Sequence, residues 1–209
     1  MKQNTSQRYA VIGDLVGSRQ QTSRAAVQKH LLTALQQVNA RLPDAVQKLE
    51  PTIGDEIQGV YADLHDALYA TVLVRLALPE GMDCRFGIGA GELESVGSSA
   101  YGLIQDGQAW WSARKAIDEA EARGRNFPGL RTRIVRDGSE KGDVVNAYLL
   151  CRDTIVSDFD GRQRRIALGV LDGKKLAQIA DEEGISTSAV SQRYRAGVSV
   201  LVESIAEVP

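Results

Sequence analysis

The sequence predicts an α+β protein in two parts: a ferredoxin-like domain over residues 1–142 and an all-α domain with a helix-turn-helix over residues 143–209. Two observations predict this division. Apolar runs typical of strands alternate with helical patterns through the first two thirds of the chain, whereas the patterns after residue 143 are helical only. Within the tail, residues 175–201 have the spacing of two helices joined by a tight turn.

The first predicted element is a buried strand that runs into a tight loop. The stretch "RYAVIGDLVGSR" is apolar as far as Gly13 and Asp14, and the turn residues Gly17 and Ser18 follow. Apolar residues at helical spacing then predict a helix over residues 23–42, which ends where a proline and an aspartate follow.

The elements that follow complete a mixed pattern. "VQKLEPTIGDEIQGVYAD" predicts two strands around a Gly-Asp turn. "LHDALYATVLVRLAL" predicts a second helix, "CRFGIGAGEL" a glycine-rich strand, "DGQAWWSARKAIDEAEAR" a third helix and "LRTRIV" a short last strand. The order strand, helix, hairpin, helix, strand, helix, strand predicts an antiparallel or mixed sheet with helices on one face.

The composition is that of a soluble globular protein, with 43% hydrophobic and 25% charged residues. The net charge of −2 excludes a chain that is basic throughout, so any surface for nucleic acid must be local. The N-terminus has no apolar core of a signal peptide, and no apolar run is long enough to span a bilayer. We therefore expect a cytoplasmic protein with no membrane partner.

Acidic residues mark the ends of two predicted strands. Asp14 ends the first strand, and Asp55 and Glu56 lie at the hairpin turn. Because the first strand and the hairpin are neighbours in a ferredoxin-like sheet, these acids are expected to converge. Converging carboxylates repel one another unless a cation lies between them, and oxygen ligands suit Mg²⁺. The sequence thus predicts Mg²⁺ on Asp14 and Asp55; the alternative is an ordinary hairpin turn.

Small residues beside these acids favour phosphate binding. Backbone amides can approach phosphate oxygens closely where side chains are small. The residues expected to do so are Gly17, Ser18 and Gly54.

The tail has the layout of a helix-turn-helix. Ile179 and Ala180 lie inside the first helix, Gly184 suits the left-handed turn, and Ser186 suits the N-cap of the second helix. Val190 falls where the second helix contacts the first. The stretch resembles the DNA-binding region four of sigma factors and similar regulator tails.

That resemblance implies two sets of DNA contacts. Side chains expected in the major groove are Ser186, Thr187, Ser188, Ser191, Gln192 and Arg195. Expected phosphate contacts are Arg162, Arg164, Arg165, Lys174 and Lys175. Basic and acidic residues are nearly balanced in the tail, which predicts modest non-specific affinity and a need for a dimer. The alternative is a trihelical packing or dimerisation module that does not bind DNA.

The front of the chain resembles class III nucleotide cyclases. "VIGDLVGSR" with "TIGDEIQGV" is similar to their metal-binding pair, and the turn is also similar to the signature of GGDEF diguanylate cyclases, with Ile53 in place of the first glycine. "RFGIGAGEL" is similar to the cyclase strand that ends in a glycine motif. "QAWWSARKAI" is similar to the helix whose asparagine and arginine stabilise the transition state.

The resemblance implies a nucleotide-cyclase-like palm in which Arg114 matches the cyclase arginine. Trp110 stands where the asparagine belongs, which argues against catalysis but leaves nucleotide binding open. The arrangement is more similar still to SatD-like bacterial proteins, which resemble a degenerate palm with a helical tail.

These features favour a DNA-binding transcriptional regulator, a homodimer in which the palm dimerises the chain or senses a nucleotide with Mg²⁺. The alternative is an active nucleotidyl cyclase or related phosphoryl-transfer enzyme, with Asp14 and Asp55 holding metal and Arg114 stabilising phosphate charge. Arg114 could also simply pair with Asp106 or Asp118 on its own helix. A third interpretation is an interaction module that uses neither site.

Overall fold

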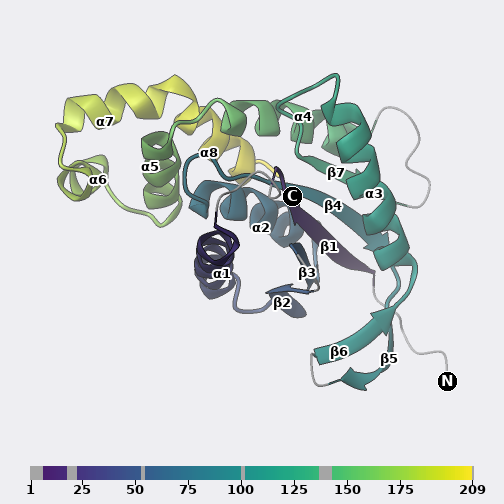
Figure 1. Cartoon of the computed structure of the whole chain (residues 1–209). Helices are drawn as coiled ribbons and strands as arrows, with labels where there is room; N and C mark the ends of the chain where they lie inside the picture. The colour runs from purple at the N-terminus through teal and green to yellow at the C-terminus, as the bar shows by residue number, and fades with distance from the viewer. Residues whose placement is uncertain (1–6, 18–22, 53–54, 100–101, 137–142, 209) are drawn as a thin grey trace.

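The computed structural model of the chain describes residues 7–17, 23–52, 55–99, 102–136 and 143–208. A five-stranded sheet forms its centre, in the order β2-β3-β1-β4-β7, and a two-stranded arm, β5-β6, extends away from it (Figure 1). The strands are β1 Arg8–Leu15, β2 Gln47–Pro51, β3 Glu56–Tyr61, β4 Cys84–Gly91, β5 Glu94–Ser99, β6 Gly102–Asp106 and β7 Thr132–Val135.

Helices follow the strands in the predicted order and then continue alone through the tail. The α-helices are α1 Arg24–Arg41, α2 Leu64–Ala77, α3 Gln108–Gly124, α4 Val144–Ser157, α5 Gly161–Leu171, α6 Leu176–Glu183, α7 Thr187–Arg193 and α8 Ser199–Ala206; a short kinked segment, η2 Tyr194–Val198, joins the last two. The helix predicted over residues 23–42 forms, and the Ser23 hydroxyl caps it by accepting from the Ala26 amide at 3.3 Å. The fold is thus a mixed α+β arrangement on a five-stranded sheet. No helix in the described part of the chain is both long and apolar enough to cross a membrane.

Strand β1 lies at the centre of the sheet and is antiparallel to both of its neighbours, β3 and β4. The neighbouring position of the first strand and the hairpin was predicted and is confirmed. Strand β7 pairs with β4 in parallel. The β5-β6 arm was not predicted.

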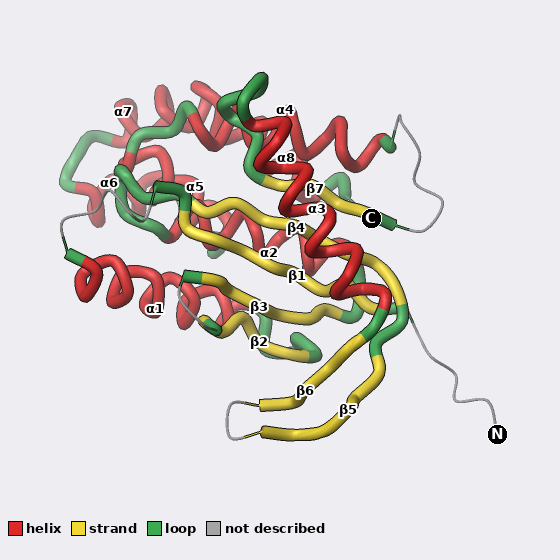
Figure 2. The backbone as a smooth tube through the Cα atoms, turned by 45° about the vertical axis from the view of Figure 1, so that its right-hand side comes forward, coloured by secondary structure: helices red, strands yellow, loops and turns green. Residues whose placement is uncertain are grey.

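The helices cover both faces of the sheet, so the prediction that they share one face was wrong. Helix α3 lies on one face of the sheet, and α1 and α2 lie on the other (Figure 2). Val11 belongs to the core on the side of α1 and α2, whereas Ala10 and Ile12 pack against α3. Helix α3 lies so close to β4 that a Cβ atom on Gly87 or Gly89 would collide with its backbone. Two glycines of the sequence "RFGIGAGEL" therefore position α3.

Two asparagines close the open edges of the sheet. Asn39 of α1 donates to the Leu49 carbonyl and accepts from the Leu49 amide, both at 2.9 Å, along edge strand β2. Asn146 of α4 does the same for Ile134 on edge strand β7, at 2.9 and 3.0 Å. Each carboxamide takes the place of a neighbouring strand, so these edges are blocked against further strand pairing at that point.

A buried ionic network joins α4 to the sheet. Asp153, which is fully buried, accepts from the amides of Arg131 and Thr132 and from the guanidinium groups of Arg75 and Arg152. Arg75 also pairs with Asp83 at 2.8 Å. Helix α4 is therefore packed on the sheet. The predicted domain boundary at residue 142 lies outside the described residues, and the division into two domains stays a prediction.

The remaining tail helices form a second core. Ile166, Ile179, Val190, Val198 and Leu201 are buried together, with Val72 of α2 beneath them. Helices α5 to α7 lie at the end of the molecule opposite the β5-β6 arm (Figure 1). The tail thus rests on α2 through apolar contacts.

Candidate functional site

Asp14 lies near the end of β1, between two strands that bring charged residues beside it. It is directly opposite Glu56 on β3 and Arg85 on β4. Residues directly opposite in an antiparallel pair share a face of the sheet. That face is the one α3 covers, and Arg114 and Glu121 reach it from that helix.

The charges around Asp14 are linked in pairs. The Arg85 guanidinium lies 3.4 Å from the Asp14 carboxylate and 3.1 Å from that of Glu121. Arg114 donates to Glu56 at 2.7 Å, and Gln58 donates to the same carboxylate at 2.9 Å. The long contact to Arg85 is weak, so Asp14 is the least well compensated acid of this group.

Burial raises the pKa of Asp14 above its usual range. Arg85 opposes this effect, whereas Glu121, Asp55 and Glu56 add repulsion and raise the pKa further. The Oδ1 atom of Asp14 is buried and has no hydrogen-bond partner among the described residues. A buried carboxylate oxygen without a donor, close to three other acids, fits a divalent cation.

Asp55 precedes β3 directly and is half-buried. Its electrostatic effect on Asp14 agrees with the predicted convergence of the two acids. Gly17 has a φ of 70°, the left-handed region that favours glycine, and the space where its Cβ would lie is open. Ser18 and Gly54, the other predicted phosphate contacts, lie outside the described residues.

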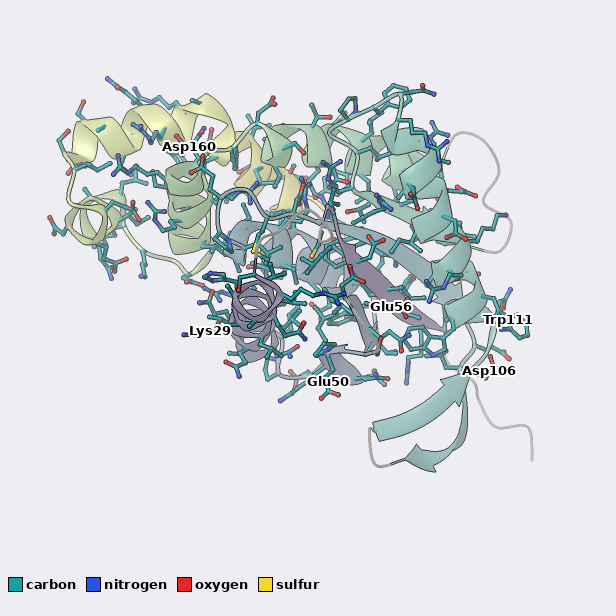
Figure 3. The ribbon with its side chains drawn as sticks, in the orientation of Figure 1. Lys29, Glu50, Glu56, Asp106, Trp111 and Asp160 are labelled. Carbon is teal, nitrogen blue, oxygen red and sulfur yellow. The ribbon has the colours of Figure 1, made fainter. Side chains whose placement is uncertain are left out.

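The Arg114 side chain points toward the acids of the sheet and does not pair with an acid of its own helix. Its partner is Glu56 of β3, in place of Asp106 or Asp118, the partners considered from spacing. Trp110, at the position of the cyclase asparagine, packs against the apolar residues between α3 and the sheet, and its indole N–H is buried without a partner among the described residues. Trp111 projects to the outside near Asp106 at the base of the arm (Figure 3).

Sequence reasoning missed two members of this site. Arg85 was not assigned to the site from the sequence, yet its side chain is only 19% exposed and lies between Asp14 and Glu121. Glu121 belongs to no motif that could be recognised in the sequence. Strand register could have found Arg85, since it pairs with Asp14 once β4 is placed beside β1.

A second acidic group lies at the start of α2. Asp63, His65 and Asp66 place ligand atoms within 4.8 Å of one another. Asp63 is the N-cap of α2 and accepts from the Asp66 amide at 2.8 Å, so helix capping accounts for it.

The tail contains two short helices joined at Gly184, which is left-handed with φ 64° and ψ 35°. The Ile185 amide donates to the Ala180 carbonyl at 3.1 Å, and the Ser186 hydroxyl accepts from the Ala189 amide at 3.2 Å. Val190 is fully buried between the helices. The local roles assigned to Gly184 and Ser186 are thus observed.

The outer face of α7 and of η2, the segment that continues it, is polar and open. Ser186, Thr187, Ser188, Gln192 and Arg195 are exposed, and Ser191 is half-buried. The side chains of Thr187, Ser188, Gln192 and Arg195 make no hydrogen bond or ion pair with any other residue that the structure describes.

Several of the predicted phosphate contacts are engaged within the tail. Arg165 and Arg162 pair with Glu183 at 2.7 and 3.3 Å, and Lys174 pairs with Glu182 at 2.7 Å. Lys175 is exposed.

Arg164 does not fit the predicted phosphate contact. Its side chain is buried and donates to the main-chain carbonyls of Arg75 and Met82. A buried guanidinium cannot reach a DNA phosphate, so Arg164 is a packing residue between α5 and α2.

Comparison with known proteins gives one family. The model of the SatD family matches residues 8–204, and no curated protein sequence matches the chain. Among solved structures, the chain is similar to the guanylate cyclase domain of RhGC from Catenaria anguillulae in complex with GTP, at 14% identity over 55% of this chain and 73% of that one (TM-score 0.44).

It is also similar to the active GGEEF domain of a diguanylate cyclase from Vibrio cholerae, at 12% identity over 62% and 83% of the two chains (TM-score 0.45). The adenylyl cyclase CyaB from P. aeruginosa matches at 12% identity over 52% and 69% (TM-score 0.41). These similarities concern the fold alone.

Proposed function

The chain belongs to the SatD family, and from this premise we propose that it is a DNA-binding transcriptional regulator whose sheet domain binds a nucleotide with Mg²⁺. The observation that supports DNA binding is the outer face of α7 and of η2, which continues it. Thr187, Ser188 and Gln192 of α7 and Arg195 of η2 make no side-chain hydrogen bond or ion pair with the described residues, while Val190 buries the inner face of α7.

Helix α7 has the chemistry to read bases. The carboxamide of Gln192 can pair with adenine, and the guanidinium of Arg195 can pair with guanine or a phosphate. Ser186, Thr187 and Ser188 lie at the start of the helix, where hydroxyls and backbone amides can meet a phosphate. We therefore assign base recognition to α7 and to the start of η2.

The basic residues of α5 and α6 supply weaker support. Glu182 and Glu183 already neutralise Lys174 and Arg165, so DNA phosphates must compete with these acids. Affinity of a single chain is then modest, and useful binding needs two copies on one DNA. Lys175 and Arg195 remain as exposed cations of the DNA-facing surface.

DNA binding is tested by selection of sequences from random duplexes on the full chain, followed by gel shift. Gln192→Ala and Arg195→Ala are expected to weaken the selected site by about 5- to 150-fold each, since a good bidentate base contact is worth about 1–3 kcal/mol. Arg125→Ala, an exposed arginine of the sheet domain, is the matched control. Equal retention of DNA by the Gln192→Ala, Arg195→Ala and control variants would reject the proposal.

The sheet domain is proposed to hold Mg²⁺ through Asp14 and Asp55, with Arg114 on a phosphate of the nucleotide. The unpaired Oδ1 of Asp14 supports the metal. Bound Mg²⁺ neutralises phosphate charge and fixes the position of the phosphates. Arg114 must exchange Glu56 for phosphate, and this exchange is open to it because its side chain is half exposed.

A nucleotide can regulate DNA binding only if it favours one arrangement of the two chains over another. Titration of GTP or ATP with Mg²⁺ into the wild type and into Asp14→Asn tests the site. Binding by the wild type alone supports it, whereas equal binding by both, or none by either, contradicts it.

Incubation with Mn²⁺ and GTP or ATP tests the alternative, a cyclase; we expect no cyclic product, because Trp110 stands in place of the asparagine donor.

A further inference from the structure

Arg85 lies beside Asp14 but pairs with it only loosely. The register of β1 and β4 places the two residues directly opposite each other. Arginine and a carboxylate typically pair through two short hydrogen bonds. Here a single guanidinium nitrogen, Nη1, lies 3.4 Å from Oδ2 of Asp14, and no described residue donates to Oδ1. The pair is therefore incomplete, although the strand register brings both side chains to one face of the sheet.

Glu121 of α3 accounts for the incomplete pair. The same nitrogen of Arg85 is closer to Oε2 of Glu121, at 3.1 Å, than to Asp14. The Arg85 side chain is only 19% exposed, whereas that of Glu121 is 57% exposed. One partly buried cation is thus shared between two acids, and the helix supplies the nearer one.

Helix α3 makes a second contact, of opposite polarity, with the same face of the sheet. Arg114 donates to Glu56 at 2.7 Å. Arg114 and Glu121 are about two helical turns apart, so they project from one side of α3. The helix therefore engages both charged residues that lie opposite Asp14, the acid on β3 and the cation on β4.

We propose that Glu121 is a positioning residue that holds Arg85 away from Asp14 and so keeps the Asp14 carboxylate open to a divalent cation. This inference rests on the metal site proposed above. Arg85 and a metal ion compete for the same carboxylate, because each brings positive charge to it. When the ion binds, Glu121 balances the charge of Arg85, which can then stay in place. The alternative is an ordinary ion pair that only fastens α3 to the sheet.

The Arg85–Glu121 pair can be broken from either side, and the two changes are expected to have opposite effects. Glu121→Gln releases Arg85 to close on Asp14 and is expected to weaken Mn²⁺ binding about fivefold, as for an ion pair worth about 1 kcal/mol. Arg85→Gln removes the competing cation and is expected to tighten Mn²⁺ binding by a similar factor. A pair that only stabilises the packing of α3 would shift both variants in the same direction.

Binding is measured on the full chain with Mn²⁺ alone, from the loss of the paramagnetic resonance signal of the free ion, in slightly alkaline buffer that keeps the carboxyl groups ionised. Mn²⁺ takes the same oxygen ligands as Mg²⁺. Asp118→Asn, an exposed acid of α3 that pairs with neither Arg85 nor Arg114, is the matched control for the loss of one negative charge. It is expected to change affinity by less than about twofold, because salt screens exposed charges.

The double variant Glu121→Gln/Arg85→Gln isolates the effect that passes through Arg85. Without Arg85, the loss of Glu121 is expected to weaken Mn²⁺ binding by less than about twofold, since only its exposed charge is removed. Equal weakening with and without Arg85, unchanged affinity in Glu121→Gln, or weaker binding in Arg85→Gln would overturn the inference and leave the metal site standing. Absence of any saturable Mn²⁺ binding that Asp14→Asn abolishes would remove the metal site itself, and this inference with it.

Discussion

At the candidate metal site, the surroundings of Asp14 disfavour the charged form of its carboxyl group. Its pKa is raised by burial and by neighbouring acids, so its ionisation opposes folding. The stability of the wild type is therefore expected to decrease as pH rises from the unfolded carboxylate pKa through the raised folded value. Asp14→Asn removes this dependence.

We expect Asp14→Asn to raise the melting temperature at pH 7 without divalent cations, and the difference to vanish in acid, where Asp14 is protonated in both states. Mg²⁺ with nucleotide is expected to raise the melting temperature of the wild type and not of the variant. Scanning calorimetry from acid to neutral pH measures both. A variant that is less stable than the wild type at every pH would mean that Asp14 has a structural role.

Gly184 is the residue on which the proposed DNA-binding helix pair depends. Its left-handed backbone costs a non-glycine residue about 1–2 kcal/mol, and no other atom lies within 4 Å of its Cβ position. Gly184→Ala is therefore expected to destabilise the chain by that amount through the backbone alone, as measured by urea unfolding, and to weaken DNA binding. Gly184→Asn is expected to cost less, since asparagine tolerates this conformation better. Equal stability of the alanine variant and the wild type would contradict this account.

At the scale of elements, Asn146 connects α4 to the edge of the sheet. Asn146→Leu removes two buried hydrogen bonds and leaves the Ile134 amide and carbonyl unpaired, at about 1–3 kcal/mol for each unpaired group. Unfolding in urea is expected to show a loss of about 2–6 kcal/mol. Asn126→Leu, an exposed position, is the control and is expected to change stability by less than about 0.5 kcal/mol. A loss no larger than that of the control would show that water replaces the asparagine.

Sequence patterns predicted most elements because their signals are local. The spacing of Val27, Leu31 and Leu35 is enough to predict α1, and Ser23 marks where the helix begins. The glycine-rich strand β4 was also found. Helix capping, turn formation and hydrophobic periodicity depend on residues that are close together in the sequence. They can therefore be recognised before the fold is known.

Relations between elements could not be predicted in the same way. The alternation of a strand places successive residues of β4 on opposite faces but does not say which helix covers each face. The helices were therefore predicted on one face, whereas α3 covers the face opposite to α1 and α2. Arg85 and Glu121 join Asp14 only through strand register and helix packing. The burial of Arg164 likewise depends on how α5 meets α2.

At the scale of the whole molecule, the buried ionic network connects the sheet to the tail. Arg75 bonds Asp83 at the start of β4, Asp153 and Ser157 on α4, and its main-chain carbonyl accepts from Arg164 on α5. These contacts span four helices or strands, and they are shielded from water. The tail therefore cannot move relative to the sheet without breaking these contacts.

The acids of the network give the molecule a characteristic pH dependence. Arg75 holds the pKa of Asp83 below its usual value of 3.8, against the effect of burial, with help from Arg131. Because the folded pKa is lowered, the stabilisation is complete above 3.8 and is lost as pH falls through the folded value. Acid is thus expected to loosen the joint between the sheet and the tail.

Arg75→Met tests whether the network joins the two parts. The change retains apolar volume but leaves Asp83 and Asp153 without their shared cation, and breaking a buried pair in this way costs about 3–5 kcal/mol. Hydrogen exchange is expected to accelerate in α4 and α5 before the central strands, since those helices depend most on the network. Arg125→Met, on the surface, is the control. If exchange accelerates uniformly, or if only stability and not the order of exchange changes, then Arg75 stabilises the fold as a whole and does not specifically join the tail to the sheet.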